Sequence, residues 1–291
     1  MPIAFPLPAR PRDLGGGFKV RRLLPAAKKQ SVGPFVFFDH FGPIVTRPGD
    51  DHDVRPHPHI GLATVTYLFE GAMLHRDSLG SVQRIEPGAI NWMTAGSGIV
   101  HSERTPPDLK SVAYTAHGLQ LWAALPLAFE ETEPSFRHTA AAALPVLTRG
   151  DLRVRVLIGD AFGLRSPVAT FAPTLYLDVE ARAGASLDLP STSGAENLER
   201  AIYSVDHPVT IDGETVPPFE MAVLTEGSAT IAAPQSARFV VIGGEPLDGP
   251  RIVWWNFVAS SRDRIERAKH DWTRQQMGRI PGEHEWIPLP R

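Results

Sequence analysis

Proline and glycine recur along the whole chain at intervals of about ten residues, and this spacing limits what the chain can fold into. The 291 residues include 25 glycines and 28 prolines, so proline makes up about 10% where roughly 5% is usual. These residues separate short runs that are rich in β-branched and aromatic side chains. The run 63–71, ATVTYLFEG, alternates between two faces and ends at a glycine. The pattern is typical of a sandwich or barrel, so we predict an all-β fold.

The strand-like runs fall into two halves of similar size and rhythm. A less apolar connection, 129–138, ends the first half, and runs such as 174–190 and 237–247 belong to the second. We therefore predict two tandem antiparallel β-barrels, in domains 1–140 and 141–291, although no residue-level repeat relates the two halves.

Only the last segment, 260–278, has a helical pattern. Ser260 is the expected N-cap with Asp263 three residues later, and Ile265 and Trp272 share one face at helical spacing. Basic side chains are frequent on this helix, which raises the alternative of a nucleic-acid-binding helix. Acidic residues are interleaved with them, and this favours a solvated, ion-paired face instead.

Composition narrows the class of protein further. Lys and Arg total 29 and Asp and Glu total 32, so the formal charge of −3 indicates neither a nucleic-acid nor an anionic-membrane partner. Cysteine is absent, which excludes disulfides, thiolate metal ligands and a cysteine nucleophile. The chain has neither an apolar run long enough for a transmembrane helix nor an N-terminal signal-peptide pattern. We expect a cytoplasmic protein.

Two short motifs offer ligands for a metal ion. One is His57-Pro58-His59 and the other is His101-Ser102-Glu103. On an extended backbone, positions i and i+2 point to the same side, so each motif can direct two ligands into one interior. With eleven histidines in the chain, one such motif by chance is not rare, but two beside β-runs favour a metal site. Nitrogen and oxygen donors suit Fe(II), Mn(II), Ni(II), Cu(II) or Zn(II).

These motifs lie within longer stretches that resemble the pirin family of the cupin superfamily. The similarity is dense from Phe38 to Gln120 and extends weakly to GGEPL at 243–247. The stretches that carry it are RPHPHIGLATVTYLFEG at 55–71, EPGAINWMTAGSGIVHSE at 86–103 and HGLQLW at 117–122.

The resemblance implies a bicupin, two cupin barrels in one chain with one metal in the N-terminal barrel. The family's ligands fall on His57, His59, His101 and Glu103, and all four are present. Family precedent favours Fe(II), with Mn, Ni, Cu and Zn as alternatives.

One position departs from the general cupin pattern. Cupins usually have a glutamate four residues after the second histidine of the first motif, where this chain has Ala63. Pirin-like proteins take their carboxylate from the second motif, which Glu103 supplies. The C-terminal half lacks both motifs and offers only His207 in DHPVTIDGE, so we expect no metal in that barrel.

The other histidines carry weaker signals. His40 and His117 are candidates for orienting the ligands, but a structural role is the favoured interpretation. His52 lies in an acidic run, GDDHD, that is typical of a solvated loop. Phe38 and Trp92 are expected among the pocket walls, together with Met93.

The resemblance implies a quercetin 2,3-dioxygenase, which opens the flavonol ring with O₂ and releases carbon monoxide. In this hypothesis Glu103, the anionic ligand, accepts the proton of the flavonol 3-hydroxyl. The implied partners are a small aromatic substrate and O₂, without nucleic acid or membrane, and a monomer is expected. Two alternatives remain open. The first is a redox-sensing regulatory protein that binds a transcription regulator or a metabolic enzyme without turnover. The second is a structural bicupin with a vestigial site.

Overall fold

The computed structural model of the chain describes residues 2–13, 18–191 and 198–290. The chain divides into two units, each assembled from three segments. The apolar unit contains Met1–Pro11, Arg21–Phe38 and Ala142–Pro246, and the histidine unit contains Arg12–Val20, Asp39–Ala141 and Leu247–Arg291.

One division between the units lies between Ala141 and Ala142. From the sequence we expect each domain to be one contiguous half of the chain, whereas each unit combines three separate segments. The N-terminal strand β1 (Ile3–Pro8) pairs antiparallel with β22 (Glu220–Leu224) of the apolar unit. The C-terminal segment belongs to the histidine unit. Both exchanges depend on contacts between residues far apart in sequence, which local spacing does not reveal.

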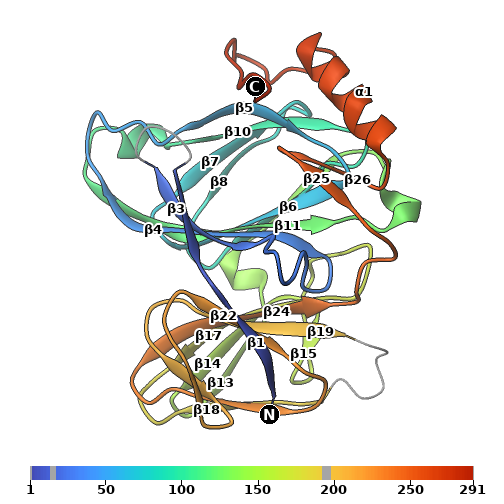
Figure 1. Ribbon diagram of the computed structural model, residues 1–291. Coiled ribbons are helices and arrows are strands. Elements are labelled where there is room, and N and C mark those ends of the chain that lie inside the picture. Colours follow the sequence, from blue (N-terminus) through green and yellow to red (C-terminus); the bar gives the residue numbers. More distant parts are fainter. Residues whose placement is uncertain (1, 14–17, 192–197, 291) are drawn as a thin grey trace. The chain divides into compact units, whose positions relative to one another are not determined.

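The histidine unit is built around two antiparallel sheets, which Figure 1 shows one above the other with β5 and β10 in the upper sheet and β6 and β11 in the lower. The predicted closed barrel is therefore corrected to a pair of separate sheets. The four-stranded sheet has the order β5 (Val54–His59), β10 (Ile99–Arg104), β7 (Met73–Asp77) and β8 (Val82–Ile85). The seven-stranded sheet has the order β12 (Ser135–Thr139), β9 (Ile90–Thr94), β6 (Leu62–Glu70), β11 (Tyr114–Ala124), β4 (Phe35–Thr46), β3 (Lys19–Leu24) and β2 (Arg10–Asp13). Most of β3 and the start of β4 fall in the segment Arg21–Phe38, which is counted with the apolar unit.

The apolar unit repeats this arrangement with a seven-stranded and a four-stranded sheet. Its interior is filled by aliphatic side chains from both sheets, among them Val156, Leu177 and Ile231. The larger sheet has the order β1, β22, β19 (Glu199–Ser204), β24 (Ala237–Gly244), β17 (Thr174–Ala181), β14 (Leu152–Ile158) and β13 (Val146–Arg149). The smaller sheet has the order β18 (Ser186–Leu189), β23 (Ala229–Ala232), β20 (Val209–Ile211) and β21 (Glu214–Val216).

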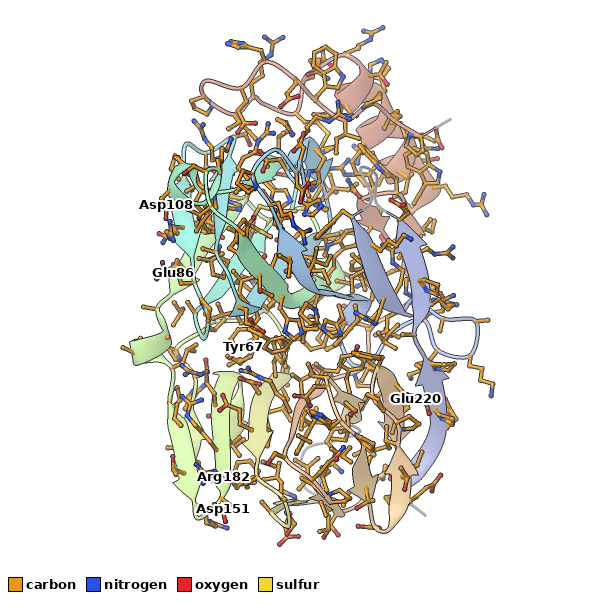
Figure 2. All side chains as sticks on the ribbon, turned by 90° about the vertical axis from the view of Figure 1, so that its left-hand side faces the viewer. Tyr67, Glu86, Asp108, Asp151, Arg182 and Glu220 are labelled. Atoms are coloured by element: carbon orange, nitrogen blue, oxygen red, sulfur yellow. The ribbon has the colours of Figure 1, made fainter. Side chains whose placement is uncertain are left out.

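Strand β6 is buried on both of its faces from Leu62 to Phe69. Tyr67 of this strand, labelled in Figure 2, is completely buried. Glu86 and Asp108 lie at the surface of the histidine unit, where both form ion pairs with Arg84. The remaining short elements are the hairpins β15 (Asp160–Ala161) with β16 (Leu164–Arg165) and β25 (Ile252–Trp254) with β26 (Phe257–Ala259), and the 3₁₀ helices η1 (Pro107–Leu109), η2 (Leu127–Phe129) and η3 (Ala141–Ala143).

The predicted C-terminal helix is present but shorter, as α1 (Arg262–Thr273), and it begins one residue later than expected. Ser261 is the N-cap, since its hydroxyl accepts a hydrogen bond from the backbone amide of Arg264 at 3.2 Å. Ser260, the predicted cap, instead donates its hydroxyl proton to Glu130 at 2.7 Å. The expected buried face is confirmed, because Ile265 and Trp272 pack into the core of the histidine unit. In the described parts of the chain, no helix is long and apolar enough to span a membrane.

Candidate metal centre

The two histidine motifs lie on neighbouring antiparallel strands, β5 and β10. His101 is directly opposite His57 in the register. His57 and His59 occupy alternate positions of β5 and therefore share one face, while the prolines between and before them occupy the other. A strand this rich in proline is tolerated because β5 is the edge strand of its sheet.

The alternation brings His57, His59 and His101 together as a buried triad. One ring nitrogen of each lies within 4.8 Å of the others. The Nε2 atoms of His59 and His101 are 3.1 Å apart. The ring centroids of His57 and His101 are separated by 4.3 Å. The two motifs thus converge on one point inside the histidine unit.

Backbone carbonyls fix the orientation of two of these rings. The Nδ1 of His57 is 2.8 Å from the carbonyl oxygen of Arg55, and the Nδ1 of His59 is 3.1 Å from that of Asn256. A carbonyl oxygen can only accept a hydrogen bond, so in both rings Nδ1 carries the hydrogen and donates it, and Nε2 keeps its lone pair. The Nδ1 of His101 is buried and has no hydrogen-bond partner among the residues that the structure describes.

The environment keeps the triad uncharged. The pKa of His57 is lowered to about 4, against an ordinary value of 6.5, mainly by burial and also by the nearby His75, and the hydrogen bond to the Arg55 carbonyl offsets only part of this. Burial also lowers the pKa values of His59 and His101 well below the ordinary value, and mutual repulsion with His57 adds to this. The imidazoles are therefore neutral at physiological pH, which is the form that binds metal ions.

The donor spacing fits a transition-metal ion. Two nitrogens bound at right angles to an ion with bonds of about 2.1 Å lie about 3.0 Å apart. The 3.1 Å between the Nε2 atoms of His59 and His101 is close to that separation. Two lone pairs that face each other at this distance repel unless a proton or a cation lies between them. The triad can hold a metal ion.

Glu103 stands apart from the triad. It follows His101 by two positions on β10 and therefore projects to the same face, opposite His75 of β7 in the register. It is not one of the residues whose ligand atoms gather within 4.8 Å. Burial raises the pKa of its carboxyl to about 7, against an ordinary value of 4.5. In the metal-free protein this carboxyl group therefore exchanges its proton near neutral pH.

The structure places a second buried pair beside the triad that sequence reasoning missed. The Nε2 of His75 is 3.0 Å from Oδ2 of Asp77, and the His75 ring stacks on Phe136 with centroids 4.1 Å apart. Burial acts to raise the pKa of the Asp77 carboxyl, but hydrogen bonds from His75 and Ser81 outweigh it and lower that pKa. The His75 ring lies 5.4 Å from that of His101. The sequence signal for this pair is His75-Arg76-Asp77 in MLHRD, which has the same i, i+2 spacing as the two histidine motifs.

The remaining expected residues lie elsewhere. His40 and His117 form a buried pair of their own, with Nε2 atoms 2.8 Å apart, and neither belongs to the triad. Phe38 is completely buried and packs edge-on against Tyr203, and its place in a pocket wall stays a prediction. Trp122 brings an aromatic ring to the triad, with its ring centroid 5.1 Å from that of His59.

Two units of paired antiparallel sheets, one with a buried histidine triad, define the class of two-domain cupin proteins. Residues 17–123 match the family described as "Pirin", and residues 176–278 match "Pirin C-terminal cupin domain". The chain belongs to the pirin family.

Similar proteins match over nearly the whole chain. A pirin-like protein of Caulobacter vibrioides is 46% identical over 97% of this chain and 97% of its own length. Human pirin is 34% identical over 93% of this chain and 91% of its own. The crystal structure of quercetin 2,3-dioxygenase from Acinetobacter baumannii has a TM-score of 0.91 and 34% identity, covering 99% of this chain and 95% of that one.

Proposed function

We propose that this protein is a metal-dependent quercetin 2,3-dioxygenase, acting on a flavonol and O₂. The observation that carries the proposal is the uncharged buried triad, in which the Nε2 atoms of His59 and His101 lie 3.1 Å apart. The name of the solved relative, quercetin 2,3-dioxygenase, supports the choice of substrate.

Four residues would hold the metal ion: the triad of His57, His59 and His101, with Glu103 as the proposed fourth ligand. Iron(II) is the proposed ion, and the same nitrogen and oxygen donors also accept Mn(II), Ni(II), Cu(II) or Zn(II). When bound, such an ion supplies a Lewis acid for the substrate oxygen and a redox partner for O₂.

The residues of the chain then supply proton transfer and shelter from water. Glu103, the anionic member of the proposed ligand set, takes the proton from the flavonol 3-hydroxyl. Trp122 and Phe136 bring aromatic surface beside His59 and His75, which excludes water and suits a flat aromatic substrate. The flavonol and O₂ together give a ring-opened ester and one molecule of carbon monoxide, so atoms balance without a further reductant.

The test is oxygen uptake and carbon monoxide release by Fe(II)-loaded protein supplied with quercetin. We expect oxygen uptake and carbon monoxide release in the wild type, and neither in His57→Ala, which lacks one ligand of the triad. Glu103→Gln should lose at least about 100-fold in turnover if Glu103 is the base. A Glu103→Gln variant that keeps both its metal and full turnover contradicts that role. Stoichiometric iron without turnover in the wild type contradicts the enzyme proposal and favours the redox-sensing regulator.

A further inference from the structure

The segment that follows α1, residues 274–290, packs against the outside of the strands that carry the triad. The backbone amide of Ile287 donates to the carbonyl of Pro56 in β5 at 2.8 Å. The indole Nε1 of Trp272 donates to the carbonyl of Ile287 at 3.0 Å. Ile280 joins Val100 of β10 in the same hydrophobic cluster. Figure 1 shows this segment beside α1 and above β5 and β10.

One carboxylate of this segment, Glu283, makes specific contacts with β10. Ser102 donates its hydroxyl proton to Oε1 of Glu283 at 2.7 Å. Arg104 donates to Oε2 from both Nε, at 3.2 Å, and Nη2. Arg76 of β7 forms an ion pair with the same carboxylate at 3.7 Å. Only 7% of the Glu283 side chain is exposed, so these charge-assisted bonds are shielded from water.

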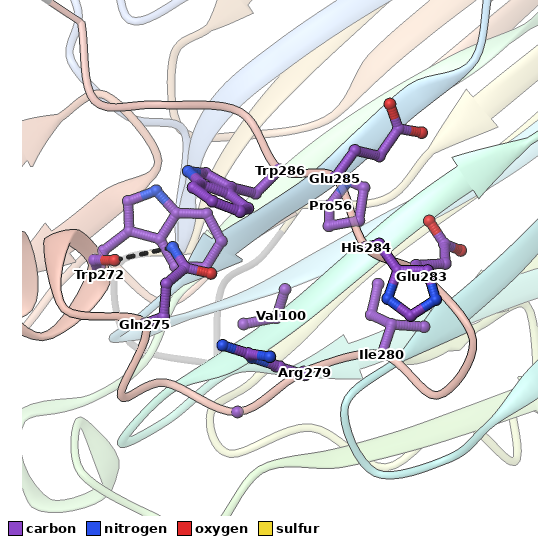
Figure 3. A pocket seen from close by; sticks show the side chains of 11 residues that line it. Pro56, Val100, Trp272, Gln275, Arg279, Ile280, Glu283, His284, Glu285 and Trp286 are labelled. Atoms are coloured by element: carbon purple, nitrogen blue, oxygen red, sulfur yellow. Dashed lines mark hydrogen bonds between the residues drawn. The ribbon is translucent and has the colours of Figure 1, made fainter.

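The partners of Glu283 alternate with the residues of the proposed metal site. Ser102 and Arg104 follow His101 and Glu103 along β10, so the carboxylate holds the outer face of the strand while the ligands project inward. The pocket in Figure 3 contains Glu283 together with Pro56 and Val100, which precede His57 and His101.

His101 has the greatest need of such support. The rings of His57 and His59 are oriented by backbone carbonyls, but Nδ1 of His101 has no such partner among the described residues. The position of its ring therefore depends on the backbone of β10 itself.

We propose that Glu283 is a positioning residue for the metal centre: by joining Ser102 and Arg104 from the outer face, it fixes β10 so that His101 and Glu103 meet the ion. This inference rests on the proposed metal site. It differs from that proposal because Glu283 itself contacts no metal and no substrate.

The test is the affinity of the purified metal-free protein for Ni(II), measured by calorimetry, with no turnover required. Glu283→Gln should weaken Ni(II) binding by about 10- to 100-fold, the range typical for residues that orient metal ligands. Glu285→Gln is the matched control. Glu285 accepts from the same Arg104 nitrogen at 2.7 Å, but its side chain is half exposed and it has no contact with Ser102. We expect this control to change affinity by about twofold or less.

A second variant and a spectroscopic measurement distinguish positioning of the metal ligands from general destabilisation of the fold. Ser102→Ala removes the hydroxyl that Glu283 binds and should weaken Ni(II) binding in the same direction, whether or not Glu283→Gln folds. The visible absorption of bound Co(II) should change in both variants and not in Glu285→Gln. Wild-type Ni(II) affinity in Glu283→Gln or in Ser102→Ala overturns the inference and leaves the proposed function intact. A wild type that binds neither Ni(II) nor Fe(II) overturns the proposed metal site instead.

Discussion

At the scale of single residues, the three members of the triad are neutral histidines, and none of them is a carboxylate. Carbonyls of Arg55 and Asn256 select the tautomer of two rings, and burial suppresses protonation of all three. The result is a set of lone pairs available to a cation before any cation arrives. Because the buried histidines resist protonation, the free energy of unfolding depends on pH.

We predict that the free energy of unfolding of the metal-free protein decreases as the pH falls from about 6.5 to about 4. In this range the unfolded chain takes up protons on the triad histidines, while the folded chain, with the pKa of His57 at about 4, does not. The unfolded state then binds more protons, so acid favours it, and His57 alone contributes about 2 kcal/mol at pH 5. Urea denaturation at about pH 7.5 and pH 5 measures the difference. His57→Gln should reduce it, and an unchanged pH dependence in that variant would argue against this origin.

Gly61, two residues after His59, has a conformation that other residues rarely adopt. Its φ is +67°, and a Cβ there would meet the carbonyl oxygen of Val258 at 2.0 Å. We predict that Gly61→Ala lowers the free energy of unfolding by more than about 2 kcal/mol, through backbone strain and this clash. Gly80→Ala is the control, because Gly80 also has a positive φ, +89°, but open space around its Cβ position. Chemical denaturation compares the two, and equal losses would show that the clash is unimportant.

At the scale of elements, helix α1 is attached to the histidine unit by two adjacent serines with different roles. Ser261 caps α1, while Ser260 binds Glu130, whose side chain lies in the turn after η2. Capping requires a β-region backbone conformation with the hydroxyl directed at the first free amides, and only Ser261 meets it. Two adjacent serines offer equivalent sequence signals, which is why the helix start was predicted one residue early.

We predict that Ser261→Ala costs about 1 kcal/mol of stability through loss of the cap. Ser260→Ala should also destabilise, but by leaving one oxygen of buried Glu130 without its donor. The two origins separate in a Glu130→Ala background, measured by thermal unfolding. There the effect of Ser261→Ala should persist and that of Ser260→Ala should largely disappear. Identical behaviour of both serines in that background would contradict these assignments.

At the scale of the whole molecule, the two units are interleaved along the chain. The first strand belongs to the apolar unit, while the C-terminal segment supplies Asn256, α1 and Glu283 to the histidine unit. A cut near residue 140 therefore removes parts from both units. The sheets and cores of each unit can be completed only by the full chain.

We predict that a fragment of residues 1–140 does not form an independent cupin domain. It lacks β22, the partner of β1, and it lacks the carbonyl of Asn256 that orients His59. Circular dichroism and thermal melting should show no cooperative transition, and calorimetry no Ni(II) binding. The full chain is the control. A fragment that melts cooperatively and binds Ni(II) would show that the contiguous half is sufficient.

The sequence predicts what depends on local alternation. The all-β class, the gathering of His57, His59 and His101, and the buried face of α1 all follow from a period of 2 or 3.6 residues. It does not predict that Glu283 would meet Ser102, because 181 positions separate them and neither carries a motif. Nor does alternation show whether two sheets close into a barrel, because closure is decided by hydrogen bonds at the sheet edges.

The bond from His59 to the carbonyl of Asn256 also bears on how the protein is made. A ribosome releases the first motif about 200 residues before Asn256, and Glu283 emerges later still. Nascent chains therefore carry histidines whose orienting partners have not yet been made. If the proposed metal site is correct, tight binding would require the finished polypeptide, and prematurely terminated chains would bind metal poorly.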